Sequence, residues 1–159
     1  MALHFDREPS IRDFIEFRRR EIFEELQELV PYADIEHVGS TAVPGGWTSG
    51  TVDVQVRVEK DRFAEAKKEI GGKYEAQDGG TKELALFGHA GRGIRVFLTV
   101  GETDSDLYTR QRNFLIEQPL VRERLDAIHR KFNGEEDAAG YAAAKEAFWK
   151  EWAEKAKGA

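Results

Sequence analysis

The sequence predicts an α+β domain, in which a small mixed β-sheet of about four or five strands is flanked by an N-terminal helix and C-terminal helices. Apolar residues recur at helical spacing over residues 10–30, alternate in the middle of the chain, and return to helical spacing after residue 103. The chain has 159 residues, of which 40% are hydrophobic and 34% charged. These values are typical of one globular unit, so residues 1–159 are expected to form a single domain.

The first helix is expected over residues 10–30, after which Pro31 ends it. One apolar face is formed by residues at helical intervals, namely Ile11, Phe14, Ile15, Ile22, Leu26 and Leu29. The opposite face carries the basic cluster Arg18-Arg19-Arg20, which invites a nucleotide or nucleic-acid interpretation. Because acidic residues lie three and four positions away, a solvated helix face supported by ion pairs is the favoured explanation.

Two strands are expected within residues 34–58, separated by a small-residue turn and a loop. The second of them, residues 52–58, alternates strictly between valine and polar residues. Its valines therefore face one way and Asp53, Gln55 and Arg57 the other. Polar side chains two residues apart on one strand face can converge on a single ion or ligand.

A short helix is expected over residues 61–70, followed by a third strand over residues 73–77 and a turn at Asp78-Gly79-Gly80. Residues 82–87 and 93–100 then predict a β-hairpin. In its second strand, Arg95, Phe97 and Thr99 lie on the face opposite the aliphatic residues.

Residues from 103 onward predict helices, with a break at Pro119 and a final helix over residues 137–155. On that last helix Tyr141 and Lys145 lie one turn apart, so both can reach the same cleft. Packing of Tyr141 beside an exposed Lys145 is the simpler alternative.

Composition excludes several classes of function. The formal net charge of −6 argues against broad electrostatic binding of nucleic acid, and the lack of cysteine rules out disulfides and thiolate sites. The N-terminus does not resemble a signal peptide and no apolar stretch reaches membrane-spanning length, so a cytoplasmic location is expected. The four histidines lack metal-ligand spacing, and neither a P-loop nor a Gly-x-Ser-x-Gly motif occurs.

The turn at Gly39-Ser40-Thr41 combines a flexible backbone with two hydroxyl groups, which suits the binding of an anion such as phosphate. His37 precedes this turn by two residues. It is a candidate to contact a substrate phosphate or act as a base, and a structural role in fixing the turn is an equal alternative.

The run HVGSTAVPG, residues 37–45, followed by Asp53, resembles the signature of the GrpB family, whose members have a nucleotidyltransferase-like fold. In that superfamily a Gly-Ser turn precedes a strand with two carboxylates that hold Mg²⁺, and the metal positions a nucleoside triphosphate. The resemblance implies that Asp53 is a metal ligand and catalytic residue. His37, from its place before the turn, is the second candidate for a catalytic residue. It extends to a late Tyr-x-x-x-Lys pair, here Tyr141 and Lys145.

Two departures from the family pattern bear on activity. Gln55 stands where the superfamily has its second carboxylate, and a neutral amide is a poor ligand for Mg²⁺. The strand of residues 93–100 has Arg95 and no acidic residue, although many superfamily members supply a third carboxylate there. Arg95 either contacts a triphosphate or pairs with Asp53, and such a pair would substitute for the missing cation.

We therefore expect a protein that binds a nucleotide or small phosphorylated ligand near the Gly39-Ser40 turn, with the incomplete carboxylate set arguing against group transfer. The residues expected to contact this ligand are Gly39, Ser40, Thr41, Gln55, Arg95, Tyr141 and Lys145. One alternative is an active Mg²⁺-dependent nucleotidyltransferase that acts on a small molecule or nucleotide. The other is a non-catalytic scaffold that binds a protein partner.

Overall fold

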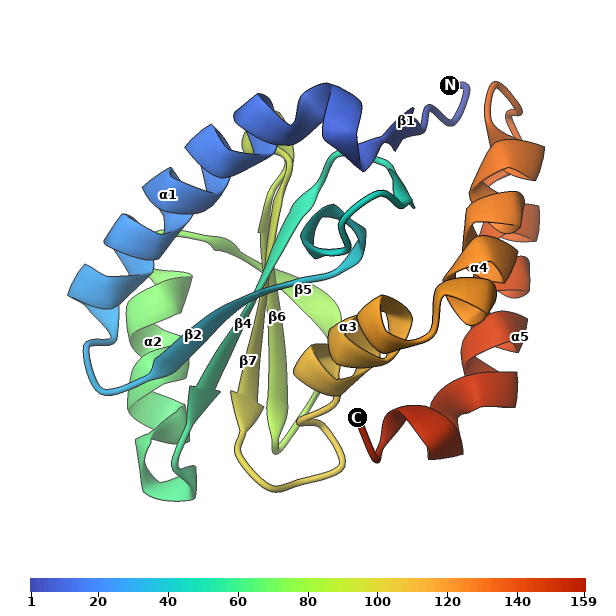
Figure 1. Ribbon diagram of the computed structural model, residues 1–159. Coiled ribbons are helices and arrows are strands. Elements are labelled where there is room, and N and C mark those ends of the chain that lie inside the picture. Colours follow the sequence, from blue (N-terminus) through green and yellow to red (C-terminus); the bar gives the residue numbers. More distant parts are fainter.

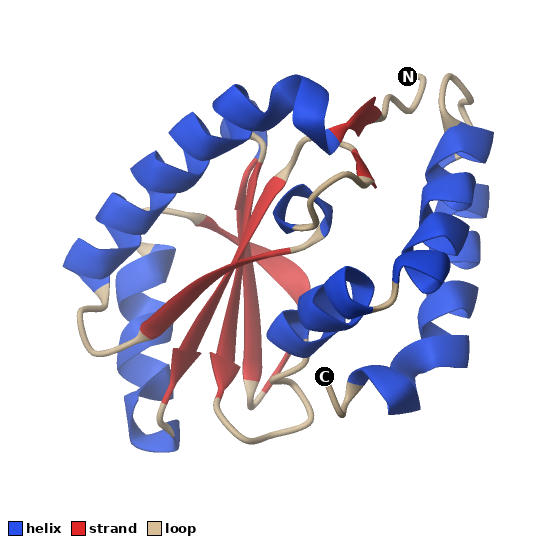
Figure 2. Cartoon of the chain, in the orientation of Figure 1, coloured by secondary structure: helices blue, strands red, loops and turns tan.

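The structure is a computed structural model that describes residues 1–159, apart from the side chain of Ala90. A twisted β-sheet stands between two groups of helices (Figures 1 and 2). Helices α1 (Arg12–Leu29) and α2 (Phe63–Gly71) cover one face of the sheet. Helices α3 (Tyr108–Glu117), α4 (Pro119–Phe132) and α5 (Ala138–Ala156) form a helical layer beside the other face. The predicted α+β class is confirmed.

The main sheet has five strands in the order β2-β4-β7-β6-β5. The pair β4–β7 is parallel, and every other neighbouring pair is antiparallel, so the sheet is mixed as predicted. The strands span Glu75–Thr81 (β5), Leu84–His89 (β6), Ile94–Val100 (β7), Asp34–Val38 (β2) and Val52–Val58 (β4). A separate two-stranded ribbon pairs Asp6–Arg7 (β1) with Trp47–Thr48 (β3).

The predicted turn at Asp78-Gly79-Gly80 is wrong, because these residues lie within β5. The pairing of β5 with β6 shifts register between Gln77 and Thr81, so the two glycines lie within the irregular part of an edge strand. The chain reverses instead between Thr81 and Leu84, the last residue of β5 and the first of β6. Glycine there marks a strand irregularity, which local sequence does not distinguish from a turn.

The buried residues form two hydrophobic cores. The first lies between the sheet and helices α1 and α2, and includes the four alternating valines of β4 together with Ile22 and Leu26. The second lies within the helical layer, around Phe114, Leu125 and Phe148. None of the helices in the described part of the chain is long and apolar enough to cross a membrane.

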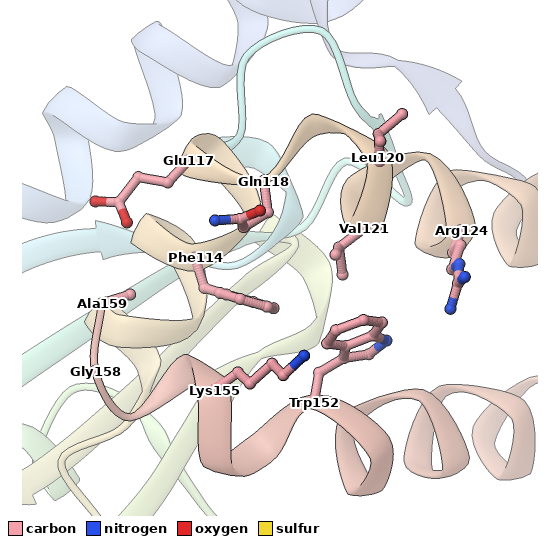
Figure 3. A pocket seen from close by; sticks show the side chains of 10 residues that line it. All are labelled: Phe114, Glu117, Gln118, Leu120, Val121, Arg124, Trp152, Lys155, Gly158 and Ala159. Atoms are coloured by element: carbon pink, nitrogen blue, oxygen red, sulfur yellow. The ribbon is translucent and has the colours of Figure 1, made fainter.

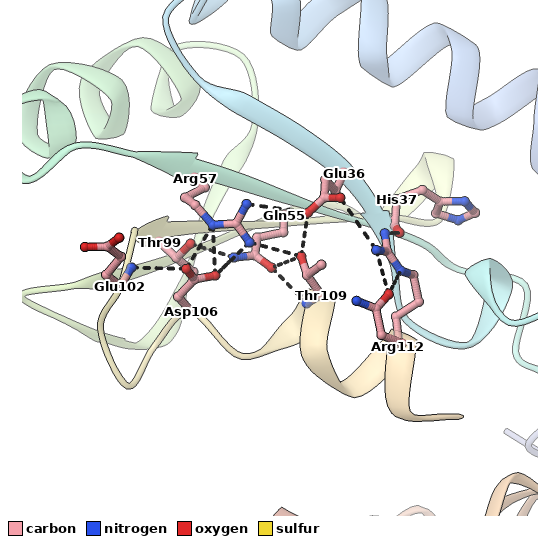
Figure 4. Close-up of polar contacts among 10 residues, drawn as sticks. Glu36, His37, Gln55, Arg57, Thr99, Glu102, Asp106, Thr109 and Arg112 are labelled. Atoms are coloured by element: carbon pink, nitrogen blue, oxygen red, sulfur yellow. Dashed lines mark hydrogen bonds and ion pairs between the residues drawn. The ribbon is translucent and has the colours of Figure 1, made fainter. Parts of the chain in front are cut away.

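Polar side chains join the helical layer to the sheet (Figure 4). Gln55 of β4 is only 1% exposed, and its amide nitrogen donates to Thr99 Oγ1 at 2.9 Å and to Asp106 Oδ1 at 2.7 Å. Its amide oxygen accepts from the backbone N–H of Thr109 at 3.0 Å. Both ends of the Gln55 amide are therefore satisfied within the protein.

An ion pair completes this connection. Arg57 Nη2 lies 2.8 Å from Asp106 Oδ1, and Arg57 Nε lies 2.9 Å from Asp106 Oδ2. Burial opposes ionisation of Asp106, yet the hydrogen bonds from Arg57 and Gln55 outweigh it and lower the pKa of the carboxyl. We call Gln55, Arg57, Thr99, Asp106 and Thr109 the polar junction. It fixes the start of α3 against β4.

A new carboxyl in place of the Gln55 amide should destabilise the protein strongly. Gln55→Glu places an acid where an amide nitrogen now donates to Asp106, so it removes two donated hydrogen bonds and adds like-charge repulsion. We expect a loss of roughly 2–4 kcal/mol in unfolding free energy at pH 7, measured by urea denaturation. The loss should shrink as the pH falls, because protonation of the new carboxyl is favoured in the folded state.

Gln27→Glu is the matched control, since Gln27 is exposed on α1. It should change the unfolding free energy by less than about 0.5 kcal/mol. Equal effects of the two substitutions would show that the polar junction does not contribute to stability in this way.

Candidate functional site

A cavity of about 280 Å³ lies between the sheet and the helical layer. We call it the interlayer cavity. Its sheet side is formed by β4 and β7 together with the turn after β2, and its other side by helices α3, α4 and α5. The lining residues with polar or aromatic side chains are Ser40, Ser49, Asp53, Arg95, Phe97, Tyr108, Gln111, Arg112, His129, Tyr141, Lys145 and Trp149.

Asp53 and Arg95 form an ion pair on the floor of this cavity. They are direct neighbours in the parallel pairing of β4 with β7, so their side chains emerge on the same face. Arg95 Nε donates to Asp53 Oδ1 at 2.8 Å and Arg95 Nη2 to Asp53 Oδ2 at 2.7 Å. This two-pronged geometry is the strong form of the guanidinium–carboxylate contact. Of the two alternatives for Arg95, pairing with Asp53 is therefore observed.

The environment makes the charge of Asp53 depend on Arg95. Asp53 is 4% exposed, and this burial raises the pKa of its carboxyl, whereas the Arg95 charge and hydrogen bonds lower it. The Arg95 side chain remains 45% exposed toward the cavity. A ligand in the cavity would therefore meet a guanidinium whose carboxylate partner lies beneath it.

The turn after β2 lies against the same carboxylate. Gly39 has a φ of 77° and a ψ of −173°, a region that is almost restricted to glycine. A Cβ atom added at Gly39 would lie 2.3 Å from Asp53 Oδ2. Ser40 lines the cavity, and its hydroxyl lies 2.7 Å from Thr48 Oγ1. Glycine thus permits close contact between the turn and Asp53.

Three residues predicted for the site do not line the interlayer cavity. His37 pairs with Val54 across the strands, so it lies on the sheet face opposite Asp53, and its Nε2 is 2.8 Å from Thr41 Oγ1. Thr41 is buried and its hydroxyl donates to the carbonyl of Thr51 at 3.2 Å. Gln55 belongs to the polar junction. These positions match the alternative in which His37 fixes the turn.

Burial lowers the pKa of His37 to about 4, and the nearby Arg19 charge adds to the shift. The imidazole is therefore neutral at pH 7, consistent with a hydrogen-bonded structural group.

Tyr141 and Lys145 both line the interlayer cavity, as their spacing on one helix predicts. Burial raises the pKa of Tyr141 to about 12, so the phenol stays protonated. Burial and then the Arg95 charge lower the pKa of Lys145. Among the residues whose side chains the structure describes, Lys145 has neither an ion pair nor a hydrogen bond; its ammonium lies 5.8 Å from the centre of the Tyr141 ring.

Sequence reasoning missed most of the helical wall. Tyr108 stacks on Phe97 of β7, with ring centres 4.1 Å apart. Arg112 donates to the carbonyl of His37 at 2.9 Å and forms an ion pair with Glu36 at 3.5 Å. His129 lines the cavity from α4. No local signal marks Tyr108 and His129, since each reaches the site through contacts distant in sequence. The resemblance to the GrpB family does include an Arg shortly before the break at Pro119, which is Arg110 or Arg112 in this sequence.

The arrangement does not fit a Mg²⁺ site of the superfamily type. Both oxygens of Asp53 accept hydrogen bonds from Arg95, and Gln55 is held in the polar junction. Within the described residues there is no group of three or more His, Cys, Asp or Glu side chains that could hold a metal ion. Mg²⁺ needs several oxygen ligands in octahedral geometry, which these residues do not provide.

A second hollow, of about 630 Å³, lies within the helical layer and shares no lining residue with the interlayer cavity. Figure 3 shows Trp152 below Val121, with Arg124 and Lys155 on either side of the indole. The guanidinium of Arg124 and the ammonium of Lys155 lie 5.5 Å and 5.0 Å from its centre. None of the predicted site residues lies here.

Gly39→Ala should destabilise the protein and disturb the Asp53–Arg95 pair. The added methyl group would clash with Asp53 in a backbone conformation that alanine rarely adopts, so we expect a loss of roughly 3 kcal/mol in unfolding free energy. Gly50→Ala is the control, because Gly50 also has a positive φ, of 86°, but its nearest contact would be a side-chain atom 3.6 Å away. Its cost should be about 1–2 kcal/mol. Equal losses in denaturant titrations would contradict the role given to the Asp53 contact.

Comparisons with known proteins identify the family. The family model described as GrpB protein matches residues 13–155. The crystal structure of the conserved protein GrpB from Enterococcus faecalis is similar with a TM-score of 0.59 and 20% sequence identity, over 84% of this chain and 92% of that chain. No curated protein sequence matches the chain.

Two structures of Cid1 are more distant. One, described for its RNA terminal uridylyl transferase activity, has a TM-score of 0.48 and 12% identity, over 73% of this chain and 38% of that one. The other, the Cid1 poly(U) polymerase with MgGTP bound, has a TM-score of 0.46 and 13% identity, over 76% of this chain and 39% of that one. At these TM-scores and sequence identities, the Cid1 structures support no statement about the activity or substrate of this chain. The family model, in contrast, spans most of the sequence and includes the HVGSTAVPG run: the chain belongs to the GrpB family.

Proposed function

We propose that this GrpB family protein binds a nucleotide or another small phosphorylated ligand in the interlayer cavity, without requiring Mg²⁺ and without transferring a phosphoryl or nucleotidyl group. The observation that carries the proposal is Lys145, a largely enclosed cation without an anionic partner among the described residues, in the same cavity as Arg95. Burying a charge is costly unless it is paired. A bound anion would supply the missing partner.

The rest of the cavity supports the same ligand chemistry. Arg95, Arg112 and Lys145 bring three positive charges to the lining, where Asp53 is the one carboxylate among the described residues. Arg95 pairs with Asp53 and Arg112 with Glu36 outside the lining, which leaves Lys145 unpaired among those residues. The guanidinium fork of Arg95 is suited to phosphate oxygens. Aromatic rings at Tyr108, Tyr141 and Trp149 offer flat apolar surface beside these cations. The volume is near the lower end for small-molecule sites, which fits a small ligand or one that extends toward solvent.

We infer the lack of phosphoryl or nucleotidyl transfer from the carboxylates that the cavity has and lacks. Phosphoryl and nucleotidyl transfer depend on cations that neutralise developing charge, and these cations are usually metal ions held by carboxylates. Here a guanidinium occupies the position against Asp53 where a metal would bind, and Gln55 replaces the second acid. The alternative of an active Mg²⁺-dependent nucleotidyltransferase would require Arg95 to leave Asp53 and another acid to enter the cavity.

Calorimetric titration with ATP, GTP, CTP, UTP, AMP and ribose 5-phosphate tests the proposal, each with Mg²⁺ and with EDTA. We expect at least one of these compounds to bind equally well under both conditions. Binding that requires Mg²⁺ and is lost in Asp53→Ala would overturn the metal-independent site in favour of the transferase. Lack of binding by all six would reject the ligand class.

Lys145→Met should weaken the binding of the same compound about tenfold or more, because it removes a charge-assisted contact and keeps most of the length of the side chain. Lys150→Met is the matched control, since Lys150 is exposed on the same helix and does not line the cavity. It should leave the dissociation constant unchanged within about twofold. Equal weakening by both would indicate general electrostatic attraction and not a defined contact.

A further inference from the structure

The interlayer cavity has more basic residues than free positive charge. Asp53 accepts hydrogen bonds from two nitrogens of Arg95, and Glu36 forms an ion pair with Arg112 at 3.5 Å from outside the lining. Lys145 is the lining cation that has no anionic partner among the described residues. The cavity therefore offers a ligand a single uncompensated positive charge.

Few hydrogen-bond donors on these cations are free. Every guanidinium nitrogen of Arg112 already donates within the protein, Nε and Nη2 to Asn113 Oδ1 and Nη1 to the carbonyl of His37. Arg95 uses Nε and Nη2 for its carboxylate, which leaves Nη1 without a partner among the described residues. Neither this atom nor Nζ of Lys145 is among the fully buried unpaired atoms, so both keep accessible surface. These two nitrogens form one set of free cationic donors, enough for one phosphate group.

Aromatic residues lie on either side of Lys145 along α5. Tyr141, Lys145 and Trp149 follow one another at intervals of four residues, and all three line the interlayer cavity. Each interval advances about 6 Å along the helix axis. The Lys145 ammonium lies 5.8 Å from the centre of the Tyr141 ring. A group attached to a phosphate at Lys145 would thus meet an aromatic ring in either direction along α5, and not a second free cation.

The charge of the ligand must match this arrangement. A phosphate monoester carries about 1.5 to 2 negative charges at pH 7, so it already uses the charge of Lys145 in full. It also favours the charged amine, against the burial that lowers the pKa of Lys145. Each further phosphate group would add negative charge that no free cation of the described lining compensates. Enclosing such charge is costly, and a Mg²⁺ ion that could offset it lacks a set of carboxylates here.

We propose that the interlayer cavity selects ligands with a single phosphate group, namely sugar monophosphates and nucleoside monophosphates, over compounds with two or three phosphate groups. The phosphate binds Nζ of Lys145 and Nη1 of Arg95, and the remainder of the ligand lies against Tyr141 or Trp149. This inference rests on the proposed function and narrows its ligand class. It excludes nucleoside triphosphates as the preferred ligands.

Titration with AMP, ADP and ATP in EDTA tests the inference on the unaltered protein, because these compounds share the sugar and base and differ in the number of phosphate groups. We expect AMP to bind at least about tenfold more tightly than ATP, with ADP between them. Ribose 5-phosphate and ribose 1,5-bisphosphate repeat the comparison without a base, and the monophosphate should again bind more tightly.

Glu36→Gln tests whether free charge sets this preference. It removes the anionic partner of Arg112 without changing a lining residue, and the new amide oxygen can still accept from Thr109. We expect the ratio of AMP affinity to ATP affinity to fall about three- to tenfold, because the added positive charge favours the triphosphate more. Asp34→Asn is the matched control, since Asp34 is exposed on the same strand, does not line the cavity and gives the same change in net charge. It should leave the ratio unchanged within about twofold.

The outcomes separate this inference from the proposed function. ATP binding as tight as AMP binding would overturn the inference and leave the proposed function standing, and the unaltered protein decides this even if a variant does not fold. Lack of binding by every compound of both series would reject the proposed function and the inference with it. A preference for AMP that Glu36→Gln changes no more than Asp34→Asn would overturn the role of free charge.

Discussion

The ion pair between Arg57 and Asp106, with Gln55 hydrogen-bonded beside it, joins two parts of the protein that have separate hydrophobic cores. Hydrophobic packing alone would not fix the helical layer at one place on the polar face of β4, because it is not directional. The polar junction does so, since each of its donors needs an acceptor at a defined distance and angle. The position of α3, and with it that of Tyr108 and Arg112, depends on these bonds.

Strand β4 buries polar side chains in two different ways. At Gln55 the protein uses a neutral amide that is fully satisfied by its neighbours. At Asp53 it retains a carboxylate and places a guanidinium against it. Each solution is complete within the chain, and neither needs an ion from solvent. In place of the metal-binding edge that the superfamily pattern implies, this protein has an internally neutralised face with spare positive charge at Lys145.

Much of the fold was predictable because its determinants are local. The strict alternation of β4, the helical spacing of α1 and the turn at Gly39 each depend on neighbouring residues, and the HVGSTAVPG run indicated the family. The pairing of Arg95 with Asp53 was one of two alternatives, because the sequence does not show the register in which their two strands pair. The irregularity at Gly79-Gly80 was not predictable, because glycine favours turns and strand bulges alike.

The site was only partly predictable for a related reason. Ser40, Asp53, Arg95, Tyr141 and Lys145 line the cavity as expected. His37 does not, because the strand period places it on the other face, and Thr41 does not because its hydroxyl is buried against the carbonyl of Thr51. Gln55 does not because Asp106 and Thr109 enclose it. Asp106 was missed because its partner Gln55 lies more than fifty residues away in sequence, and His129 because only the packing of α4 brings it to the cavity.

The ring of Phe5 stacks on His129 of α4, with ring centres 4.9 Å apart, and this contact bears on the order of folding. Leu3 and Phe5 hydrogen-bond to residues 133–135, in the turn between α4 and α5, so segments separated by almost the whole chain meet beside His129. Closing so long a loop is entropically unfavourable until most other contacts exist. The helices and the β-hairpin can form early from neighbouring residues, whereas this contact between the two ends of the chain is expected among the last to form. Native structure throughout the sheet would therefore precede the attachment of the N-terminal segment to the helical layer.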